Sequence, residues 1–368
     1  MRILYGVVGE GMGHATRSRV ILEELIKEHE VHVVSSGRAT AFLRQRFPSV
    51  HHIWGYTIAY RGNSVRNWQT VVQNLKGAVR GWPQNIRRYF EIIRDFKPEV
   101  VISDFETFSY LFAKRHRIPV ISADNMQIID RCRHPASLLK GFELQFQLSR
   151  AIVRSKLPHA FHYLIATFFY PPVSRTRTTL LPPLLRTEVL DARPEPGKHL
   201  LVYQTTSTNL KLPEILKDAA MPCRIYGLRR ELTEDIVEGN LTYRPFDETR
   251  FIEDLRTAVA VIAGGGFTLM SEAVYLHKPM LSIPVKGHFE QTLNALYLQK
   301  LGFGAYAPEL THGALSGFIA QHERYRESLQ LYQQDRNVRF FAALKKQLAR
   351  AVNPSAYTET PDTGAAGH

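Results

Sequence analysis

The segment "VAVIAGGGFTLMSEAVYLHKPMLSIPVKGHFEQTLNALYLQKLGFG", residues Val259 to Gly304, decides the fold of the second half of the chain. An apolar run ends at Ala263, three glycines follow, and a helical pattern begins directly after them. A second apolar run, "HKPMLSIPV", leads into another helical pattern. Strands that alternate with helices in this way predict a parallel sheet wrapped by helices.

The first half of the chain shows the same alternation. The predicted strands are Arg2 to Val8, Glu30 to Ser35, Val50 to Trp54, Val100 to Ser103 and Pro119 to Ser122. The predicted helices are Thr16 to Glu28, Ala39 to Arg46, Thr70 to Phe96 and Phe108 to His116. The fold class is therefore α/β, with two Rossmann-like doubly wound domains.

Composition limits the classes of protein to which this chain can belong. Of its residues 44% are hydrophobic and 22% charged, and no apolar run reaches the ~20 residues of a membrane-spanning helix. The start lacks a signal-peptide pattern, so we expect a cytoplasmic protein. The net charge of +13 favours an acidic partner, but the basic residues form no nucleic-acid-binding motif. Cys132 and Cys223 lie far apart, and we expect neither a disulfide nor a metal site.

Polar residues of the quoted segment fit a nucleotide-sugar site. The glycines Gly264 to Gly266 let a phosphate approach the backbone where the N–H groups of a new helix are free. Glu272 lies about one and a half turns into that helix, where its carboxylate can accept two hydrogen bonds from a ribose diol. Glu290 and Gln291 follow the next strand, at the edge where ligands bind in open α/β sheets.

The glycine turn, the Ser-Glu pair, the "HKP" turn, "HFEQTLNA" and the final "GFG" resemble the donor-binding region of inverting GT-B glycosyltransferases. Within that group the chain is similar to the lipid II-forming N-acetylglucosaminyltransferase, the UDP-sugar transferases and the teichoic-acid-biosynthesis-like enzymes of bacteria and archaea. The resemblance implies a cleft between two domains, a UDP-linked sugar donor, and no cofactor or metal. The donor-binding residues that it implies are Gly264, Gly265, Gly266, Phe267, Thr268, Glu272, His288, Glu290 and Gln291.

One position departs from the family pattern. Ala263 stands where the family has Arg or His before the glycine turn. The hydroxyl-rich loop after the strand that begins at His199 is the candidate substitute for that charge. Its donor-binding residues would be Gln204, Thr205 and Thr206.

The loop "GEGMGH", Gly9 to His14, follows the first strand and is a poor dinucleotide-binding fingerprint. Its third glycine is one position short of G-x-G-x-x-G, and Ser35 stands where a ribose-binding acid would end the second strand. In the GT-B resemblance this loop faces the cleft. Gly11, Gly13 and Arg17 would then lie near the acceptor or a phosphate.

The resemblance implies that His14 is the catalytic base. Imidazole suits this role because its unperturbed pKa is about 6.5. Asp104, at the end of a predicted strand, would orient His14, in the manner of a His–Asp pair. Capping of the next helix is an alternative role for Asp104. Glu10 and Glu106 are rival bases.

The resemblance also divides the chain into parts. Residues 1–190 form an acceptor-binding domain, and 199–320 form a donor-binding domain after a proline-rich linker at 191–198. Residues 321–352 form a C-terminal helix that braces the N-terminal domain. We expect the tail, 353–368, to be disordered.

The segment Arg150 to Arg186 mixes apolar, aromatic and basic residues and contains no acid. This composition favours a lipid-linked acceptor and a peripheral position at the inner face of an anionic membrane. A buried aromatic core with solvated arginines is the alternative. The basic run Arg80 to Arg94 predicts an amphipathic helix beside the cleft.

Two other functions are alternatives to a transferase. One is a nucleotide-sugar hydrolase or 2-epimerase, and the other is a non-catalytic nucleotide-sugar-binding protein.

Overall fold

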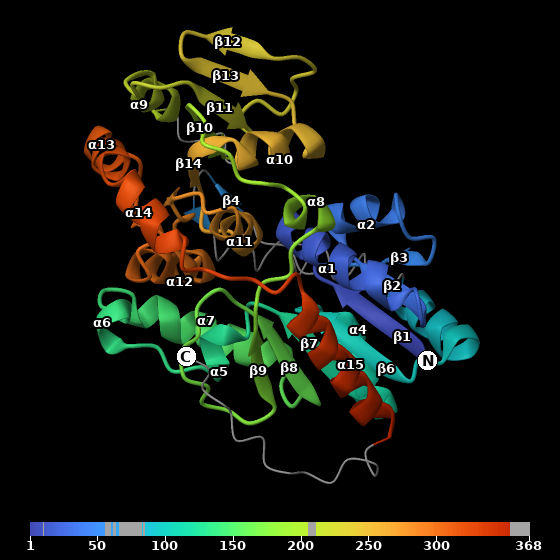
Figure 1. Ribbon diagram of the computed structural model, residues 1–368. Helices are drawn as coiled ribbons and strands as arrows, with labels where there is room; N and C mark the ends of the chain where they lie inside the picture. Colours follow the sequence, from blue (N-terminus) through green and yellow to red (C-terminus); the bar gives the residue numbers. More distant parts are fainter. Residues whose placement is uncertain are drawn as a thin grey trace.

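In the computed structural model the chain folds around two seven-stranded sheets, one in each domain (Figure 1). The structure describes residues 1–9, 11–55, 60–61, 64–65, 83, 85–204 and 211–353. Four predictions lie wholly or almost wholly outside these residues: those for Glu10, Thr205 and Thr206, and for the C-terminal tail. The first half of the helix predicted over Thr70 to Phe96 also lies outside them, and residues 85–96 of its second half are helical.

The strands of the N-terminal sheet are all parallel and follow the order β3-β2-β1-β6-β7-β8-β9. This order reverses between β1 and β6, so the carboxyl ends of these two strands flank the point where open α/β sheets bind ligands. The strands are β1 (Arg2–Val7), β2 (Glu30–Ser35), β3 (Val50–His52), β6 (Val100–Asp104), β7 (Val120–Asp124), β8 (His162–Ala166) and β9 (Thr178–Leu181).

Helices connect these strands. The first helix begins at Met12, four residues before its predicted start at Thr16, because its glycine-rich first turn is helical rather than a loop. The N-terminal elements are α1 (Met12–Leu25), α2 (Gly37–Arg44), β4 (Tyr60–Arg61), β5 (Ser64–Val65), the π-helical η1 (Ile92–Phe96), α4 (Thr107–His116), α5 (Ile128–Arg131), α6 (Ala136–Leu139) and α7 (Glu143–Lys156).

The C-terminal sheet follows the order β12-β13-β11-β10-β14-β15-β16, with β12 antiparallel to β13. Its order reverses between β10 and β14. The strands are β10 (His199–Tyr203), β11 (Cys223–Tyr226), β12 (Ile236–Glu238), β13 (Leu241–Arg244), β14 (Ala258–Ala263), β15 (Met280–Ser282) and β16 (Gly304–Tyr306). The helices between them are α9 (Leu212–Lys217), α10 (Glu248–Arg256), α11 (Phe267–Tyr275) and α12 (Phe289–Lys300).

The prediction of one C-terminal helix over 321–352 is wrong, because the chain breaks that helix. Residues Arg336 and Asn337 have φ angles of 55° and 69°, a left-handed conformation that a continuing helix does not allow. The last helices are α13 (His312–Ala320), α14 (His322–Leu329) and α15 (Val338–Val352). Of these three helices it is α15, red in Figure 1, that returns to the N-terminal domain, where it contacts β6 and β8.

The segment Arg150 to Arg186 contains the end of α7 and the strands β8 and β9, which the sequence did not predict. Its aromatic residues Tyr163, Phe168 and Phe169 are buried, with at most 3% of their surface exposed. They belong to the hydrophobic core, so the core alternative accounts for these three aromatic residues of the segment.

Candidate active site

The carboxyl end of β6 delivers Asp104 to the switch point of the N-terminal sheet. Its carboxylate is fully buried and accepts hydrogen bonds from Arg17 and from Ser18 Oγ, the latter over 3.0 Å. Its Oδ1 also lies 2.8 Å from Nδ1 of His14 on α1. The two residues therefore meet although they lie far apart in the sequence.

Burial disfavours a charged Asp104, but the charges and hydrogen bonds of Arg17 and His14 outweigh burial and lower the pKa of Asp104. The Nδ1 atom of His14 also lies 2.9 Å from Arg17 Nη2. One nitrogen cannot donate to Asp104 and accept from Arg17 in the same tautomer. The tautomer that donates to Asp104 leaves Nε2 unprotonated, as a general base requires.

Glu106, a rival base by sequence, caps helix α4. Its two carboxylate oxygens accept hydrogen bonds from the backbone N–H groups of Phe108 and Ser109, each over 2.6 Å. Burial raises its pKa. The N-cap of α4 is therefore Glu106 and not Asp104, and the alternative that gave Asp104 the capping role is wrong.

Arg17 was predicted to bind an acceptor or a phosphate, but its described partners are protein groups. It is 3% exposed and pairs with Asp104, and its Nη1 donates to Asn125 Oδ1 over 2.7 Å. The early start of α1 also removes Arg17 from the first helical turn, where its charge would oppose the helix dipole.

Asn125 extends this network into the C-terminal domain and escaped the sequence prediction. Its Nδ2 donates to Glu290 Oε1 over 2.8 Å, and Asn294 donates to the same oxygen over 2.7 Å. A signal was present, since Asn125 directly follows the buried strand β7, beside β6. The predicted sugar-binding carboxylate of Glu290 is thereby bonded to the network around His14.

The glycine turn after β14 lies at the switch point of the C-terminal sheet. A side chain on Gly265 would clash with the backbone of Gln291, since its Cβ would lie 2.2 Å from that carbonyl oxygen. A Cβ on Gly266 would meet nothing within 4 Å. The second glycine is thus needed for packing against α12, and the third leaves space at the start of α11.

The start of α11 lies against the start of α1. Thr268 Oγ1 donates to the carbonyl oxygen of Gly13 over 3.1 Å. Neither helix has a side-chain cap at its N-cap residue, Gly11 or Gly266. The free N–H groups and the helix dipoles of both elements favour an anion between the domains.

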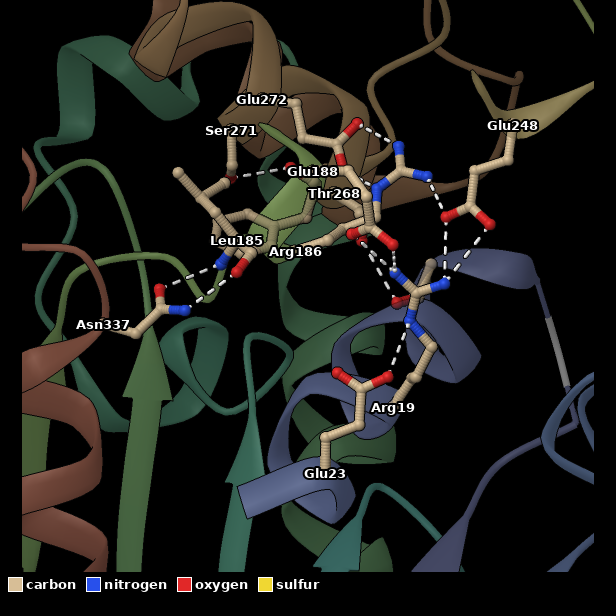
Figure 2. A network of polar contacts seen from close by, with 12 residues as sticks. Arg19, Glu23, Leu185, Arg186, Glu188, Glu248, Thr268, Ser271, Glu272 and Asn337 are labelled. Atoms are coloured by element: carbon tan, nitrogen blue, oxygen red, sulfur yellow. Dashed lines mark hydrogen bonds and ion pairs between the residues drawn. The ribbon is translucent and has the colours of Figure 1, made fainter. Parts of the chain in front are cut away.

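Glu272, the predicted ribose ligand, is 1% exposed. Its two oxygens accept hydrogen bonds from Nε and Nη2 of Arg186, each over 2.8 Å (Figure 2). A ribose can reach this carboxylate only if the groups around it move. The ribose role of Glu272 stays a prediction.

The other predicted donor residues surround the glycine turn. Gln291 Oε1 accepts from the backbone N–H of Val285 over 3.0 Å. The ring of Phe267 is buried and stacks on Phe168 of the N-terminal domain, with ring centroids 6.1 Å apart. His288 Nδ1 lies 3.6 Å from Glu290 Oε2. Gln204 directly follows β10, at the same switch point.

Two further properties bear on the predicted partners. Among the described residues, no group of three or more His, Cys, Asp or Glu side chains could hold a metal ion. In the same part of the chain, no helix has the length and apolar character needed to cross a membrane.

Two doubly wound domains whose switch points face each other define the GT-B class of glycosyltransferase folds. A solved glycosyltransferase of kitacinnamycin superposes with a TM-score of 0.65 at 17% identity, covering 94% of this chain and 99% of that one. UGT2 of Phytolacca americana, complexed with UDP-2-fluoro-glucose and pterostilbene, gives a TM-score of 0.63 at 12% identity and covers 94% and 98%. The predicted GT-B fold is confirmed.

A family model described as glycosyl transferase family 1 matches residues 1–322, and the chain belongs to that family. An uncharacterised glycosyltransferase of Methanosarcina mazei is 26% identical over 325 residues, which covers 83% of this chain and 85% of the relative. The protein is therefore an enzyme that transfers sugars, as the sequence predicted.

Proposed function

We propose that the enzyme transfers a sugar from a UDP-linked donor to an acceptor hydroxyl, with inversion at the anomeric carbon and without a metal ion. The observation that carries this proposal is the position of the His14–Asp104 pair. Gly13, next to His14, accepts the hydrogen bond of Thr268, two residues beyond the open Gly266. A base thus lies at the same domain boundary as the anion-binding helix start.

In the proposed reaction, His14 Nε2 takes the proton of the acceptor hydroxyl while that oxygen attacks the anomeric carbon of the donor. The bond between this carbon and the diphosphate oxygen breaks on the opposite face, and UDP leaves. Asp104 holds the His14 tautomer and stabilises the imidazolium that forms. The N–H groups at the start of α11 stabilise the charge of the leaving diphosphate. Glu290 and Gln291 hold sugar hydroxyls.

A solved structure with the same fold supports the proposal that the donor is linked to uridine diphosphate. The Phytolacca americana enzyme, which has the same fold, was solved with UDP-2-fluoro-glucose. A saturation-transfer NMR screen of nucleotide-sugars with the full chain identifies the nucleotide and the sugar. Binding of another nucleotide-sugar in place of UDP-linked donors would contradict this part of the proposal.

Incubation of the purified protein with UDP-sugars and no acceptor tests the reaction class. A transferase releases UDP slowly, and the rate rises when an acceptor is added. Rapid release equal to the donor supplied would indicate a hydrolase, and tight binding without release would indicate a sensor. Activity should also be retained in EDTA, and its loss there with recovery on adding Mg²⁺ would contradict a metal-independent mechanism.

The variant His14→Ala tests the base. We expect turnover to fall by more than about 100-fold, with UDP affinity by calorimetry nearly unchanged. The matched control is His116→Ala, which removes an exposed histidine at the end of α4. Near-normal turnover in His14→Ala would assign the base to another group.

We also propose a lipid-linked acceptor at an anionic membrane surface. The support is helix α7, on which Leu144, Leu148 and Ile152 follow one another at four-residue spacing and are 73%, 56% and 58% exposed. The exposed cations Lys140 and Arg154 lie three residues before the start of α7 and in its last turn. Apolar side chains flanked by cations are typical of helices that lie on a membrane surface.

Co-sedimentation with phosphatidylglycerol vesicles tests this surface. We expect salt-sensitive binding by the unaltered protein and loss of binding in Leu148→Ser. The control, Leu331→Ser, changes a leucine that is 83% exposed and lies outside α7. Absence of binding at low salt would exclude the membrane and leave the transfer reaction untouched.

A further inference from the structure

The segment that connects the two domains carries an arginine between two carboxylates (Figure 2). Arg186 donates from Nε and Nη2 to both oxygens of Glu272, and from Nη1 to Glu248 over 2.6 Å. The parallel pair of bonds to Glu272 is the fork geometry that only a guanidinium provides. The two parallel bonds therefore fix the orientation of the Glu272 carboxylate.

A second arginine ties the same network to the N-terminal domain. Arg19 of α1 is 1% exposed and donates to both oxygens of Glu248, over 3.0 and 3.2 Å. It also donates to both oxygens of Glu188 on the connecting helix α8 (Thr187–Leu190). A continuous chain of ion pairs therefore runs from α1 through the connection to α11.

The two carboxylates that pair with Arg186 differ in their exposure to solvent. The side chain of Glu248 is 29% exposed, and with Glu188 it lines a hollow of about 750 Å³ beside α10. The side chain of Glu272 is 2% exposed. Burial favours the neutral form of Glu248, but the hydrogen bonds and charge of Arg186, together with Arg19, lower its pKa overall.

The backbone beside Arg186 is also anchored. The N–H and carbonyl groups of Leu185 bond to the side chain of Asn337, over 3.0 and 2.8 Å (Figure 2). Tyr275 at the end of α11 donates to the carbonyl of Leu190 over 2.9 Å. With its backbone and its guanidinium both fixed, Arg186 keeps the Glu272 carboxylate in one orientation.

A carboxylate oxygen accepts two hydrogen bonds, so each oxygen of Glu272 has one acceptor position beyond its bond to Arg186. We propose that Arg186 is a positioning residue for the donor nucleotide. It orients Glu272 so that the remaining acceptor positions of this carboxylate receive the ribose diol once the groups that cover them have moved. This inference rests on the proposed function, in which Glu272 binds the ribose. Arg186 acts through Glu272 and does not itself touch the donor.

Calorimetric binding of UDP and of 2′-deoxyuridine 5′-diphosphate to the full chain tests this role. The ratio of the two affinities measures ribose recognition alone, because both ligands carry the same base and diphosphate. We expect the unaltered protein to prefer UDP by about tenfold or more, the effect of one hydrogen bond to a charged group. In Arg186→Met we expect a preference below about threefold, with little change in the affinity for the deoxynucleotide.

The matched control is Arg336→Met. Arg336 also ties down the connecting segment, through the carbonyl of Leu190 and the carboxylate of Asp191, but it has no bond to Glu272. We expect its ratio to equal that of the unaltered protein. A purely structural role of Arg186 would lower both affinities together and leave the ratio unchanged.

An unchanged ratio in Arg186→Met overturns the inference. If that variant does not fold by circular dichroism, Arg186→Lys decides, because it keeps the charge and loses the fork. There too we expect the ratio to fall by about threefold or more, and an unchanged ratio refutes the role. UDP binding without preference by the unaltered protein overturns the inference and leaves the UDP donor standing, whereas no UDP binding overturns both.

Discussion

The hydrogen bond from Asn125 to Glu290 predicts that Asn125→Asp weakens the domain interface in a pH-dependent way. The substitution replaces an amide nitrogen, which donates to Glu290 Oε1 over 2.8 Å, with a carboxylate oxygen. The two residues are only 4% and 8% exposed, so water does not separate the two negative charges. The variant therefore changes the charge at the interface and leaves the shape of the side chain unaltered.

The size of the effect follows from the distances. At 2.8 Å and an effective dielectric constant of ~20, the repulsion from Glu290 is about 6 kcal/mol. Arg17, whose Nη1 lies 2.7 Å from Asn125 Oδ1, attracts the new charge by about the same amount. These two energies nearly cancel. The remaining destabilisation comes from the lost hydrogen bond to a charged group, about 1.5–3 kcal/mol, and from the burial of an added charge. We expect a loss of about 3 kcal/mol near pH 8.

Acid should relieve this loss, because one proton shared by the two carboxyl groups restores a hydrogen bond between them. The introduced carboxyl then has a higher pKa in the folded than in the unfolded chain, so the variant recovers stability as the pH falls toward the folded-state value. The entropy of unfolding is about 2.1 cal/mol/K per residue. Over 368 residues, a loss of about 3 kcal/mol in the free energy of unfolding therefore lowers the melting temperature by about 4 °C.

Scanning calorimetry of the variant and the unaltered protein, at about pH 8 and about pH 5, measures this difference. We expect the deficit in melting temperature to shrink to less than about half at the lower pH. The control Asn125→Ala removes the bond without adding a charge, so its deficit should be similar at both pH values. A deficit in Asn125→Asp that is the same at both would refute the reasoning.

Two further predictions concern the N-terminal domain. Removal of the α4 cap in Glu106→Ala should lower the free energy of unfolding by about 1–2 kcal/mol in urea titrations, and unchanged stability would show that other groups satisfy these N–H groups. Burial, with the nearby Arg88 and His32, lowers the pKa of His51 to about 4. The unfolded chain, with a histidine pKa of about 6.5, then binds more protons between these two values, so stability falls as the pH drops through this window. In His51→Gln, the free energy of unfolding, measured by thermal melts, should fall by about 1–2 kcal/mol less over this pH window than in the unaltered protein. An identical pH dependence of the two proteins would assign the fall to other groups.

The parts of the fold that the sequence predicted are those that a local pattern encodes. Strand β2 was predicted with the bounds observed, Glu30 to Ser35, because a buried parallel strand is a short apolar run between turns. The strands β8 and β9 escaped because arginines and prolines lie between and around their short apolar runs, which suggested a surface segment. The break at Asn337 escaped because its side chain bonds to Leu185, a distant residue that no local pattern reveals.

For the candidate site, the position of a residue directly after a predicted strand was informative, but the sequence did not show which side chains bond to one another. Asp104 and the glycine turn follow predicted strands, and the rule that ligands bind at the carboxyl ends of parallel strands predicted them as site residues. His14 was predicted from the resemblance to GT-B enzymes. The partners of Arg17 and Glu272 depend on how two domains dock. Asn125 obeys the same strand-end rule as Asp104, whereas Arg186 lies in a connection with no periodicity to mark it.

The return of α15 to the first domain also orders the events of synthesis. A ribosome finishes residues 1–190 first, and domains generally fold as they emerge. The helix that covers β6 and β8 is made last, after the whole donor-binding sheet. The first domain to be translated is thus the last to be completed, because β6 and β8 lack the packing of α15 until that helix has been made.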